Sequence, residues 1–357
     1  MRLTAENQER YLGSIQGSYL SYSNDDRLRS NCASGGIVTV LLSHLLRKGT
    51  IDGAYVCRHV MNEDRIAHEV KIVTDPDEVA EFAGSVYFDI PLLSNLESIR
   101  DFDGRIAVVG LPCQIKALSV LCSQDKEIAD KIALKIGLFC GHNSCRELIQ
   151  EVLKKKGILE RDVKKVIFRK GHWRGDMHIL TTDKNEIVFP FHHFSTYQNL
   201  HIDSLKKCMH CHDHTAEHSD VSCGDAWLSY LRSDPIKHSI LITRTEKSDE
   251  LVRGLRREGT IYLMGVEPEI VFESQRRALL YHKAIEARSR VGEWFGYKIG
   301  YPSEYENTSR WNDYLSAAIA LSNIKMSYNS KARAILHLVP RQILFLYLLL
   351  FKLLTNF

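Results

Sequence analysis

Residues 104–122 read GRIAVVGLPCQIKALSVLC and hold the clearest structural pattern in the chain. The apolar run at 106–109 predicts a buried strand, and Pro112 is typical of the first turn of a helix. The same rhythm returns at 131–157, where an apolar strand leads through the turn CGHN into a second helix. Apolar strands followed directly by helices predict an α/β fold with mixed, partly parallel sheets flanked by helices.

The turns that follow these two strands are candidate site positions. In open α/β sheets, ligands bind outside the carboxyl ends of the strands. Cys113 and Cys140 each occupy a turn directly after an apolar strand. We therefore expect both thiols to face a site at the edge of the sheet.

Other segments extend the pattern on both sides. Runs rich in β-branched and aromatic residues predict strands, with a hairpin turn at 182–186. These runs lie at 52–60, 67–75, 166–191 and at both ends of 239–263. Helices are predicted at 37–47, at 76–84 behind Pro76, inside 239–263 and, as one charged helix, at 268–290. The cysteine- and histidine-rich stretch 208–227 is predicted to be a loop.

Composition excludes several classes of protein. With 357 residues, 44% of them apolar and 25% charged, the chain has the composition of a globular protein. A net charge of +3 without a dense Lys/Arg block argues against nucleic-acid binding. Nine cysteines are too few for a disulfide-rich secreted scaffold, and the N-terminus lacks an apolar signal-peptide core. We therefore expect a cytoplasmic protein whose odd number of cysteines favours ligand or catalytic roles.

Domain boundaries are weakly marked, because the chain has no internal repeat and no low-complexity linker. We divide it into an N-terminal part at 1–100, a catalytic part at 101–285 and an α-helical C-terminal extension at 286–357. The extension includes an apolar tail.

The stretch CMHCHDHTAEHSDVSCGDAW at 208–227 is a candidate metal site. Cys208 and Cys211 form a CxxC pair, which brings two thiolates to one ion or to two corners of a cluster. Zinc with nearby histidines, an iron–sulfur cluster and a thiol redox pair all fit this local spacing. If Cys113 and Cys140 supply two more thiolates, the set favours a cubane cluster or an all-thiolate zinc.

Three further segments carry candidate binding residues, each with a simpler structural reading. Ser34, Gly35 and Gly36 precede a helix and could direct backbone N–H groups at an anion, although such turns more often only cap the helix. The segment FRKGHWRG at 168–175 contains three basic residues around an aromatic, which suits a phosphorylated or carboxylated ligand or a solvated hairpin face. Asp225 could orient a ribityl hydroxyl or cap a turn.

The C-terminal tail KARAILHLVPRQILFLYLLLFKLLTNF is strongly apolar. Its longest uncharged run, 342–351, is half of the roughly 20 residues that span a bilayer, so we do not expect a spanning helix. Four basic residues accompany it: Lys331, Arg333, Arg341 and Lys352. A terminal helix docked on the body or on a partner protein and a peripheral contact with the inner face of the membrane both remain open.

Six of these segments, in this order, resemble the family of coenzyme F420 hydrogenase/dehydrogenase beta subunits. They lie at 31–54, 108–118, 137–144, 166–175, 208–227 and 240–251. The P-C-Q-I turn at 112–115 and the C-x-x-C-x-D-x-T and G-D-x-W pieces of 208–227 are the most specific. The resemblance covers roughly residues 25–285.

The resemblance implies a flavoprotein with FAD and a 4Fe-4S cluster. It implies that the cluster ligands are Cys113, Cys140, Cys208 and Cys211. It places the flavin beside Ser34, Gly35, Gly36, Thr39, Pro112, Gln114, Arg169, Lys170 and Asp225. The expected activity is an oxidoreductase that passes electrons between a one-electron donor, such as ferredoxin or another redox protein, and a small-molecule hydride acceptor. Coenzyme F420 or a related organic molecule would be that acceptor.

Three features depart from the family pattern. The chain has no additional CxxCxxC run, so electrons must reach its single cluster from a separate carrier. Cys223 stands where the family usually has an aliphatic residue, and would be a buried thiol or an alternative ligand. The tail lies outside the resemblance. The competing hypothesis is a non-enzymatic, zinc-stabilised adaptor that docks on a membrane surface or a partner protein through the tail.

Overall fold

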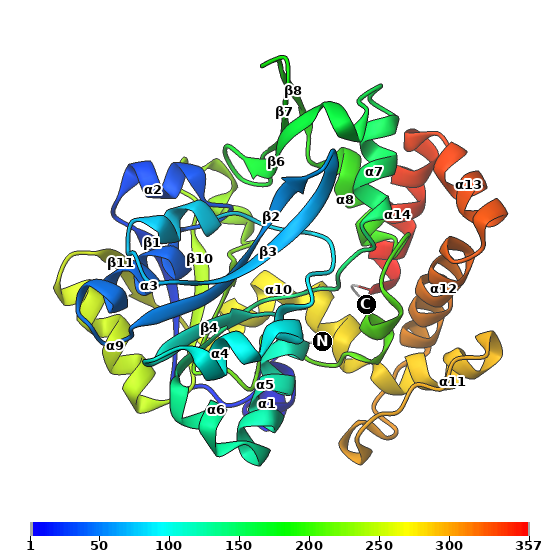
Figure 1. Cartoon of the computed structure of the whole chain (residues 1–357). Coiled ribbons are helices and arrows are strands. Elements are labelled where there is room, and N and C mark those ends of the chain that lie inside the picture. The colour runs from blue at the N-terminus through cyan, green and yellow to red at the C-terminus, as the bar shows by residue number, and fades with distance from the viewer. Residues whose placement is uncertain (1–2, 356–357) are drawn as a thin grey trace.

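The computed structural model describes residues 3–355 and is built around one large twisted sheet (Figure 1). Its eight strands run in the order β11-β1-β10-β9-β5-β4-β2-β3. In that spatial order they are Ile261–Gly265, Gly17–Ser23, Ser239–Thr243, Val221–Asp225, Ile132–Leu138, Ile106–Gly110, Gly53–Asn62 and Arg65–Val73. Strands from both halves of the chain therefore contribute to a single sheet.

The centre of the sheet is parallel and its edges are antiparallel. The neighbouring pairs β9–β5, β5–β4 and β4–β2 are parallel. Hydrogen bonding is antiparallel between β2 and β3 at one edge, and among β9, β10, β1 and β11 toward the other. The prediction of a mixed, partly parallel α/β sheet is confirmed.

Helices cover both faces of this sheet. Along β10 the side chains alternate, so that Leu241 packs with Ile37 and Leu41 on one face while Ile240 and Ile242 belong to the core on the other. The flanking helices are α1 (Ala5–Leu12), α2 (Asp26–Asn31), α3 (Ile37–Arg47), α4 (Glu97–Asp101), α5 (Pro112–Gln124), α6 (Lys126–Lys131), α9 (Glu246–Arg257) and α10 (Pro268–Lys283).

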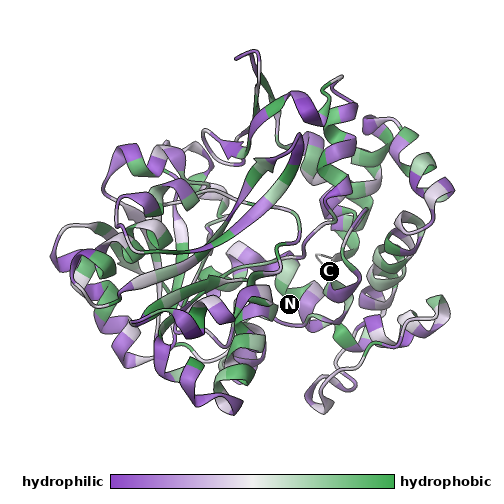
Figure 2. Ribbon diagram, in the orientation of Figure 1, coloured by the Kyte–Doolittle hydropathy of each residue, from purple (hydrophilic) through white to green (hydrophobic). Residues whose placement is uncertain are grey.

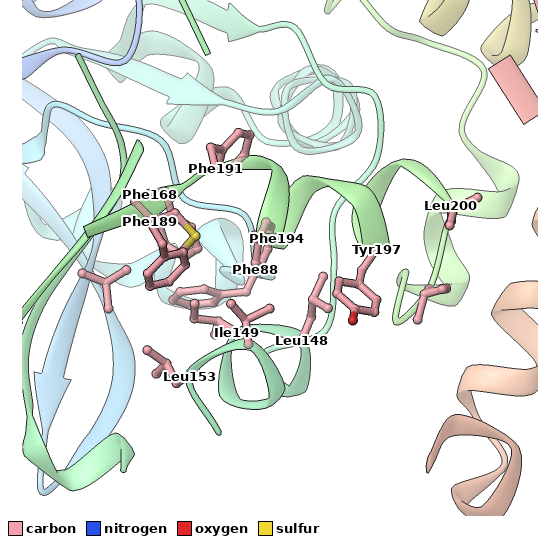
Figure 3. Close-up of a cluster of buried hydrophobic side chains, with 14 of the residues drawn as sticks. Phe88, Leu148, Ile149, Leu153, Phe168, Phe189, Phe191, Phe194, Tyr197 and Leu200 are labelled. Atoms are coloured by element: carbon pink, nitrogen blue, oxygen red, sulfur yellow. The ribbon is translucent and has the colours of Figure 1, made fainter. Parts of the chain in front are cut away.

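A smaller three-stranded antiparallel sheet stands beside the large one. It consists of β6 (Val163–Lys170), β7 (Asp176–Thr181) and β8 (Glu186–Pro190), and its β7–β8 connection confirms the predicted hairpin. Helices α7 (Glu147–Lys154) and α8 (His192–Asn199) pack against it. Figure 3 shows the buried aromatic cluster there, where the rings of Phe88, Phe168 and Phe194 gather between β6, α7 and α8.

The C-terminal extension is helical, as predicted. It contains α11 (Ile285–Phe295), α12 (Trp311–Ser327), α13 (Ser330–Leu338) and α14 (Arg341–Thr355). Leu344, Leu348 and Phe351 of α14 are buried in the same core as the aromatic cluster. In the described part of the chain no single helix is long and apolar enough to cross a membrane. The pair α13 and α14 passes that test only jointly, with a bend of 101° between them.

Three local predictions are wrong. The helix predicted at 76–84 is present only as a short 3-10 helix, Glu78–Phe82, so its bounds were too wide. The charged helix predicted at 268–290 is broken at Ala284 into α10 and α11. Stretch 208–227 is not all loop, because 221–225 forms strand β9 in the middle of the sheet. The proposed boundaries at residues 100 and 285 stay predictions.

Candidate functional site

The parallel strands bring three candidate residues to one edge of the sheet. Cys113 is the second residue of α5, which begins two residues after β4 ends, and Cys140 follows β5 by two residues. Asp225 is the last residue of β9. Because β4, β5 and β9 are parallel neighbours, their carboxyl ends share one edge, which is where such sheets bind ligands.

The CxxC pair joins this edge through the segment that follows Cys140. A short 3-10 helix, Lys206–His210, carries Cys208, and the N–H of Leu205 donates to the Asn143 carbonyl at 3.1 Å. The N–H of Asn143 donates in turn to the Cys208 sulfur at 3.4 Å. On the other side of the pair, the N–H of Cys140 donates to the carbonyl of His214 at 3.0 Å.

The four thiols lie within electrostatic range of one another. Burial raises the pKa of Cys140 well above its ordinary value, and Cys208, Cys211 and Cys113 raise it further. Burial likewise raises the pKa of Cys208 to about 12 and that of Cys211 to about 11. Four neighbouring thiols, of which Cys113 is exposed and the other three are partly buried, resist joint ionisation unless a cationic centre neutralises them, and a thiolate-bound metal group supplies such a centre. The donor set therefore fits the implied iron–sulfur cluster.

The same geometry bears on a single-ion site. Among residues 3–355, no three His, Cys, Asp or Glu side chains converge closely enough to hold one metal ion. A zinc ion with Zn–S bonds of about 2.3 Å needs sulfurs about 4 Å apart, whereas a cubane takes one cysteine at each of four iron atoms. His214 is buried with both ring nitrogens engaged, Nδ1 with the Cys140 carbonyl and Nε2 with Gln275 Oε1, each at 3.0 Å.

Arg288 of α11 fixes the backbone of the CxxC loop, a role that no sequence pattern indicated. Its side chain is fully buried. Nε donates to the Met209 carbonyl at 3.1 Å and Nη2 donates to the Cys211 carbonyl at 2.6 Å. Further bonds reach the carbonyls of Tyr281 and His282. A buried cation thus lies beside the thiol group, and its bonds span from α10 to the loop.

A pocket opens along the same sheet edge, beyond the carboxyl end of β9. It is shallow, and its empty volume of about 290 Å³ includes space open to solvent. It is lined by Ala33, His172, Trp173, Asp225, Ala226, Trp227, Leu231, Ile236, Lys237 and His238. The rings of Trp173 and Trp227 meet edge to face with centroids 5.2 Å apart. The glycine turn after α2, the β6–β7 turn and the G-D-x-W segment, all distant in sequence, meet here.

Positive charge surrounds the Asp225 carboxylate of this pocket. Arg169 is buried and donates from Nη1 to Asp225 Oδ2 at 2.6 Å. Burial opposes its charge, but Asp225 raises the pKa of the guanidinium overall. Burial lowers the pKa of Lys237, and the nearby Arg169 lowers it further. Arg174 lies over the Trp227 ring at 5.2 Å. Three cations and one carboxylate suit an anionic ligand with a flat ring.

The turn before α3 is held mainly by internal bonds. Ser34 Oγ donates to the His238 carbonyl at 3.0 Å, and the N–H of Gly35 donates to Ser239 Oγ at 2.9 Å. Gly36 caps the helix with a φ of 79°, a conformation that favours glycine. Thr39 is buried with its hydroxyl 3.9 Å from the Cys32 sulfur. The turn borders the pocket through Ala33, while the flavin role of these four residues stays a prediction.

Three other predicted flavin residues do not line the pocket. Pro112 and Gln114 belong to the first turn of α5 on either side of Cys113. Gln114 Oε1 accepts from the N–H of Leu111 at 2.9 Å and its Nε2 donates to the Ile90 carbonyl at 2.8 Å, so this side chain caps the helix. Lys170 is exposed at the end of β6. Their assignment also stays a prediction.

The structure explains the presence of Cys223. Its side chain is buried in the core against α3, and its backbone pairs with Leu241 of β10 and Leu138 of β5. The residue that follows, Gly224, must lack a side chain, because a Cβ there would lie 2.1 Å from the ring of Phe139. Cys223 is therefore a core thiol of β9.

Comparison with known proteins matches this chain to one family. Residues 18–97 match the model for the N-terminal part of the coenzyme F420 hydrogenase/dehydrogenase beta subunit, and residues 103–269 match the model for its C terminus. The chain belongs to the family of coenzyme F420 hydrogenase/dehydrogenase beta subunits. Its members are parts of oxidoreductases, and the predicted resemblance is confirmed.

Three curated relatives show the extent of the similarity. The chain is 28% identical to a coenzyme F420-dependent sulfite reductase of Methanocaldococcus jannaschii, over 74% of this chain and 40% of that protein. It is 28% identical to one of the subunits of the F(420)H(2) dehydrogenase of Methanosarcina mazei, over 56% of each. It is 26% identical to coenzyme F420 hydrogenase subunit beta of Methanothermobacter thermautotrophicus, over 68% and 82%. The chain thus spans only about half the length of the first two relatives.

A solved structure shares the fold. A chain of the F420-reducing [NiFe] hydrogenase complex from Methanosarcina barkeri aligns with a TM-score of 0.62 and 21% identity. The alignment covers 82% of this chain and 98% of that one. The common architecture confirms the fold class.

Proposed function

We propose that this chain is a flavin- and iron–sulfur-dependent oxidoreductase. It passes electrons between a one-electron donor, such as ferredoxin or another redox protein, and a small organic hydride acceptor, coenzyme F420 or a related molecule. Cys113, Cys140, Cys208 and Cys211 hold a 4Fe-4S cluster in this proposal. FAD lies along the same edge of the sheet, with only part of the dinucleotide in the pocket beside Asp225.

One observation carries the proposal: three parallel neighbouring strands end at the same edge of the sheet, where the cysteines and the pocket lie. Strands β4 and β5 lead to Cys113 and Cys140, and β9 leads to Asp225 and the pocket. Bound there, the cluster would supply one-electron transfer and the flavin would convert it to hydride chemistry. Such a converter needs its two groups close together, which this shared edge supports.

The chain's own residues bind and orient in this scheme. Arg169, Arg174 and Lys237 offer positive charge to the phosphates of a dinucleotide. The indole rings of Trp173 and Trp227 provide apolar walls beside them. Asp225 keeps Arg169 in place through the ion pair and offers a carboxylate to a hydroxyl of the ligand. The nine cysteines are all free, which fits a reducing, cytoplasmic location.

Spectroscopy of protein purified without air tests the proposal. We expect a brown protein with broad absorbance near roughly 400 nm, acid-labile sulfide and extractable FAD. Changing Cys113, Cys140, Cys208 or Cys211 singly to Ser should remove most of the iron. Colourless protein that contains stoichiometric zinc would refute the cluster and support the adaptor hypothesis.

Cys122→Ser is the matched control. Cys122 lies on the same helix as Cys113 and is likewise free. This variant should retain the iron content and the absorbance of the wild type. Equal loss of iron from the Cys122 and Cys113 variants would mean that the substitutions act through folding and would contradict the assignment.

The hydride acceptor is tested with reduced ferredoxin as donor. If F420 is the acceptor, its absorbance should fall after mixing. If the flavin is reduced but passes its electrons only to another organic molecule, that molecule is the substrate. A flavin that ferredoxin cannot reduce would overturn the proposed electron path.

A further inference from the structure

Helix α14 is apolar on both of its sides. Leu344, Leu348 and Phe351 face the protein and are buried. The opposite side exposes six large apolar residues, Ile343, Phe345, Leu346, Leu349, Leu350 and Leu353. Leu346 is 59% exposed and Leu353 is 57% exposed. A surface helix normally turns a polar side to water, so a helix that is apolar all round indicates a second apolar environment.

Exposed apolar side chains also lie on the neighbouring helices. On α13, Leu338 is 81% exposed. On α12, Trp311 is 72% exposed, and Nδ2 of the adjacent Asn312 donates to the carbonyl of Leu354, which places Trp311 near the end of α14. We call the exposed residues of α14 together with Leu338 and Trp311 the C-terminal apolar face. Figure 2 shows green, hydrophobic segments on these helices, mixed with purple ones, at the side of the molecule away from β11.

The C-terminal segment that carries this face contains basic residues but no acidic ones. Residues 330–357 contain four Lys or Arg and no Asp or Glu. Arg333 is paired with Asp203 of the body. Arg341, at the start of α14, is exposed and hydrogen-bonds to the rings of His192 and His193 at 2.9 and 3.0 Å. Lys156 lies near enough to Arg341 to feel its charge, so positive charge gathers at this end of the helix.

We propose that the C-terminal apolar face docks on the surface of an anionic lipid bilayer, with α14 lying in the interface. Three features favour a bilayer over a protein partner. The face is apolar along the whole helix, whereas the area of protein interfaces is only about 56–58% non-polar in non-obligate complexes and about 65% in homodimers. It has a basic border that complements anionic headgroups, and an exposed tryptophan of the kind enriched at membrane interfaces. The proposal is independent of the redox function.

Vesicle sedimentation with the full chain tests this proposal. The probe is vesicles of phosphatidylcholine mixed with phosphatidylglycerol, compared with vesicles of phosphatidylcholine alone. The protein should pellet with the mixed vesicles and bind markedly less to the neutral ones. Each cation near an anionic surface strengthens binding about fivefold, so Arg341→Gln should weaken binding to the mixed vesicles by about that factor.

The apolar contribution is tested with the double change Leu346→Glu and Leu350→Glu. Both side chains are exposed, so the fold should survive, and circular dichroism checks this. Binding to the mixed vesicles should fall to background. The matched control is Met264→Glu on edge strand β11, also exposed but at the opposite end of the molecule, which should bind as the wild type does.

Two results would overturn the proposal. The first is wild-type protein that stays in the supernatant with both kinds of vesicle. The second is a wild-type protein that is a dimer and does not bind vesicles, and that becomes a monomer in the double variant. The C-terminal apolar face would then be a contact between two copies of the chain. Iron and flavin contents are unaffected by either result, so failure here is distinct from failure of the redox proposal.

Discussion

Single residues decide how firmly the CxxC loop is held, and Arg288 is the principal one. We predict that Arg288→Met lowers the free energy of unfolding by about 3 kcal/mol, because buried carbonyls of Met209 and Cys211 lose a charged donor. Urea denaturation measures this loss. Arg256→Met, at an exposed position of α9, should change stability by less than about 0.5 kcal/mol. Equal effects of the two changes would contradict the role of Arg288.

Asp225 gives a second prediction at the residue scale. Asp225→Asn keeps the shape of the side chain but leaves the buried Arg169 without its counter-charge. Removal of one partner of a buried pair costs about 3–5 kcal/mol, and we expect about 2 kcal/mol here because the Asp225 side chain is 24% exposed.

The control for this change is Asp26→Asn, which removes an exposed ion pair with Arg29. An exposed pair contributes about 0–1 kcal/mol, so urea denaturation should show almost no difference from the wild type. A loss of stability in the Asp225 variant as small as in this control would mean that Arg169 does not depend on Asp225.

Some residues of the candidate site could be predicted from the sequence and others could not. Cys113 and Cys140 could be placed because each follows an apolar strand. In a strand–turn–helix unit the turn lies at the carboxyl end of the strand, so the pattern predicts where these cysteines lie. Arg288 and Lys237 could not be placed, because Arg288 lies in a charged helix and Lys237 in a polar loop, and only the fold buries Arg288 fully and Lys237 in part.

At the scale of elements, β9 shows where local pattern fails. Residues 221–225, VSCGD, contain a glycine and an aspartate and resemble a turn. Two neighbours, β5 and β10, pair with this segment from both sides and make it a strand. By contrast, the strands β2, β4 and β5 and the helices α3 and α5 were predictable, because their apolar periodicity and end signals agree with the tertiary structure.

The attachment of α13 to the body gives a prediction that depends on pH. Buried Asp203 accepts hydrogen bonds from Arg333 Nε at 2.7 Å and His337 Nε2 at 2.8 Å. Burial would raise the pKa of Asp203, but the bonds from His337 and Arg333 lower it overall. A lowered pKa in the folded state means that this stabilisation is complete above the unfolded value of about 4. It is lost as pH falls through the folded value.

Asp203→Asn tests this linkage. The difference in unfolding free energy between the wild type and this variant should be largest near about pH 6 and shrink toward about pH 3. Urea denaturation at several pH values measures it. A difference that does not change over this range would show that the charge of Asp203 is not what holds α13.

At the scale of the whole molecule, the proposed cluster would tie the large sheet to the loop held by the C-terminal helices. Its ligands come from α5, the end of β5 and the segment beside α11. A group that binds only the folded state stabilises it, so we predict that cluster-loaded protein melts several degrees above cluster-free protein. Calorimetry without air measures both forms. The Cys122→Ser protein should keep the full difference, and identical melting temperatures would contradict it.

The position of β1 has a consequence for how the protein is made. This strand, at residues 17–23, pairs with β10 and β11, which lie more than 200 residues later in the chain. Contacts between such distant segments form late and slow folding. The edge that carries Cys140 and Asp225 is therefore incomplete on the ribosome until residue 265 has emerged. Iron would therefore reach the four cysteines only after residue 265 has been made.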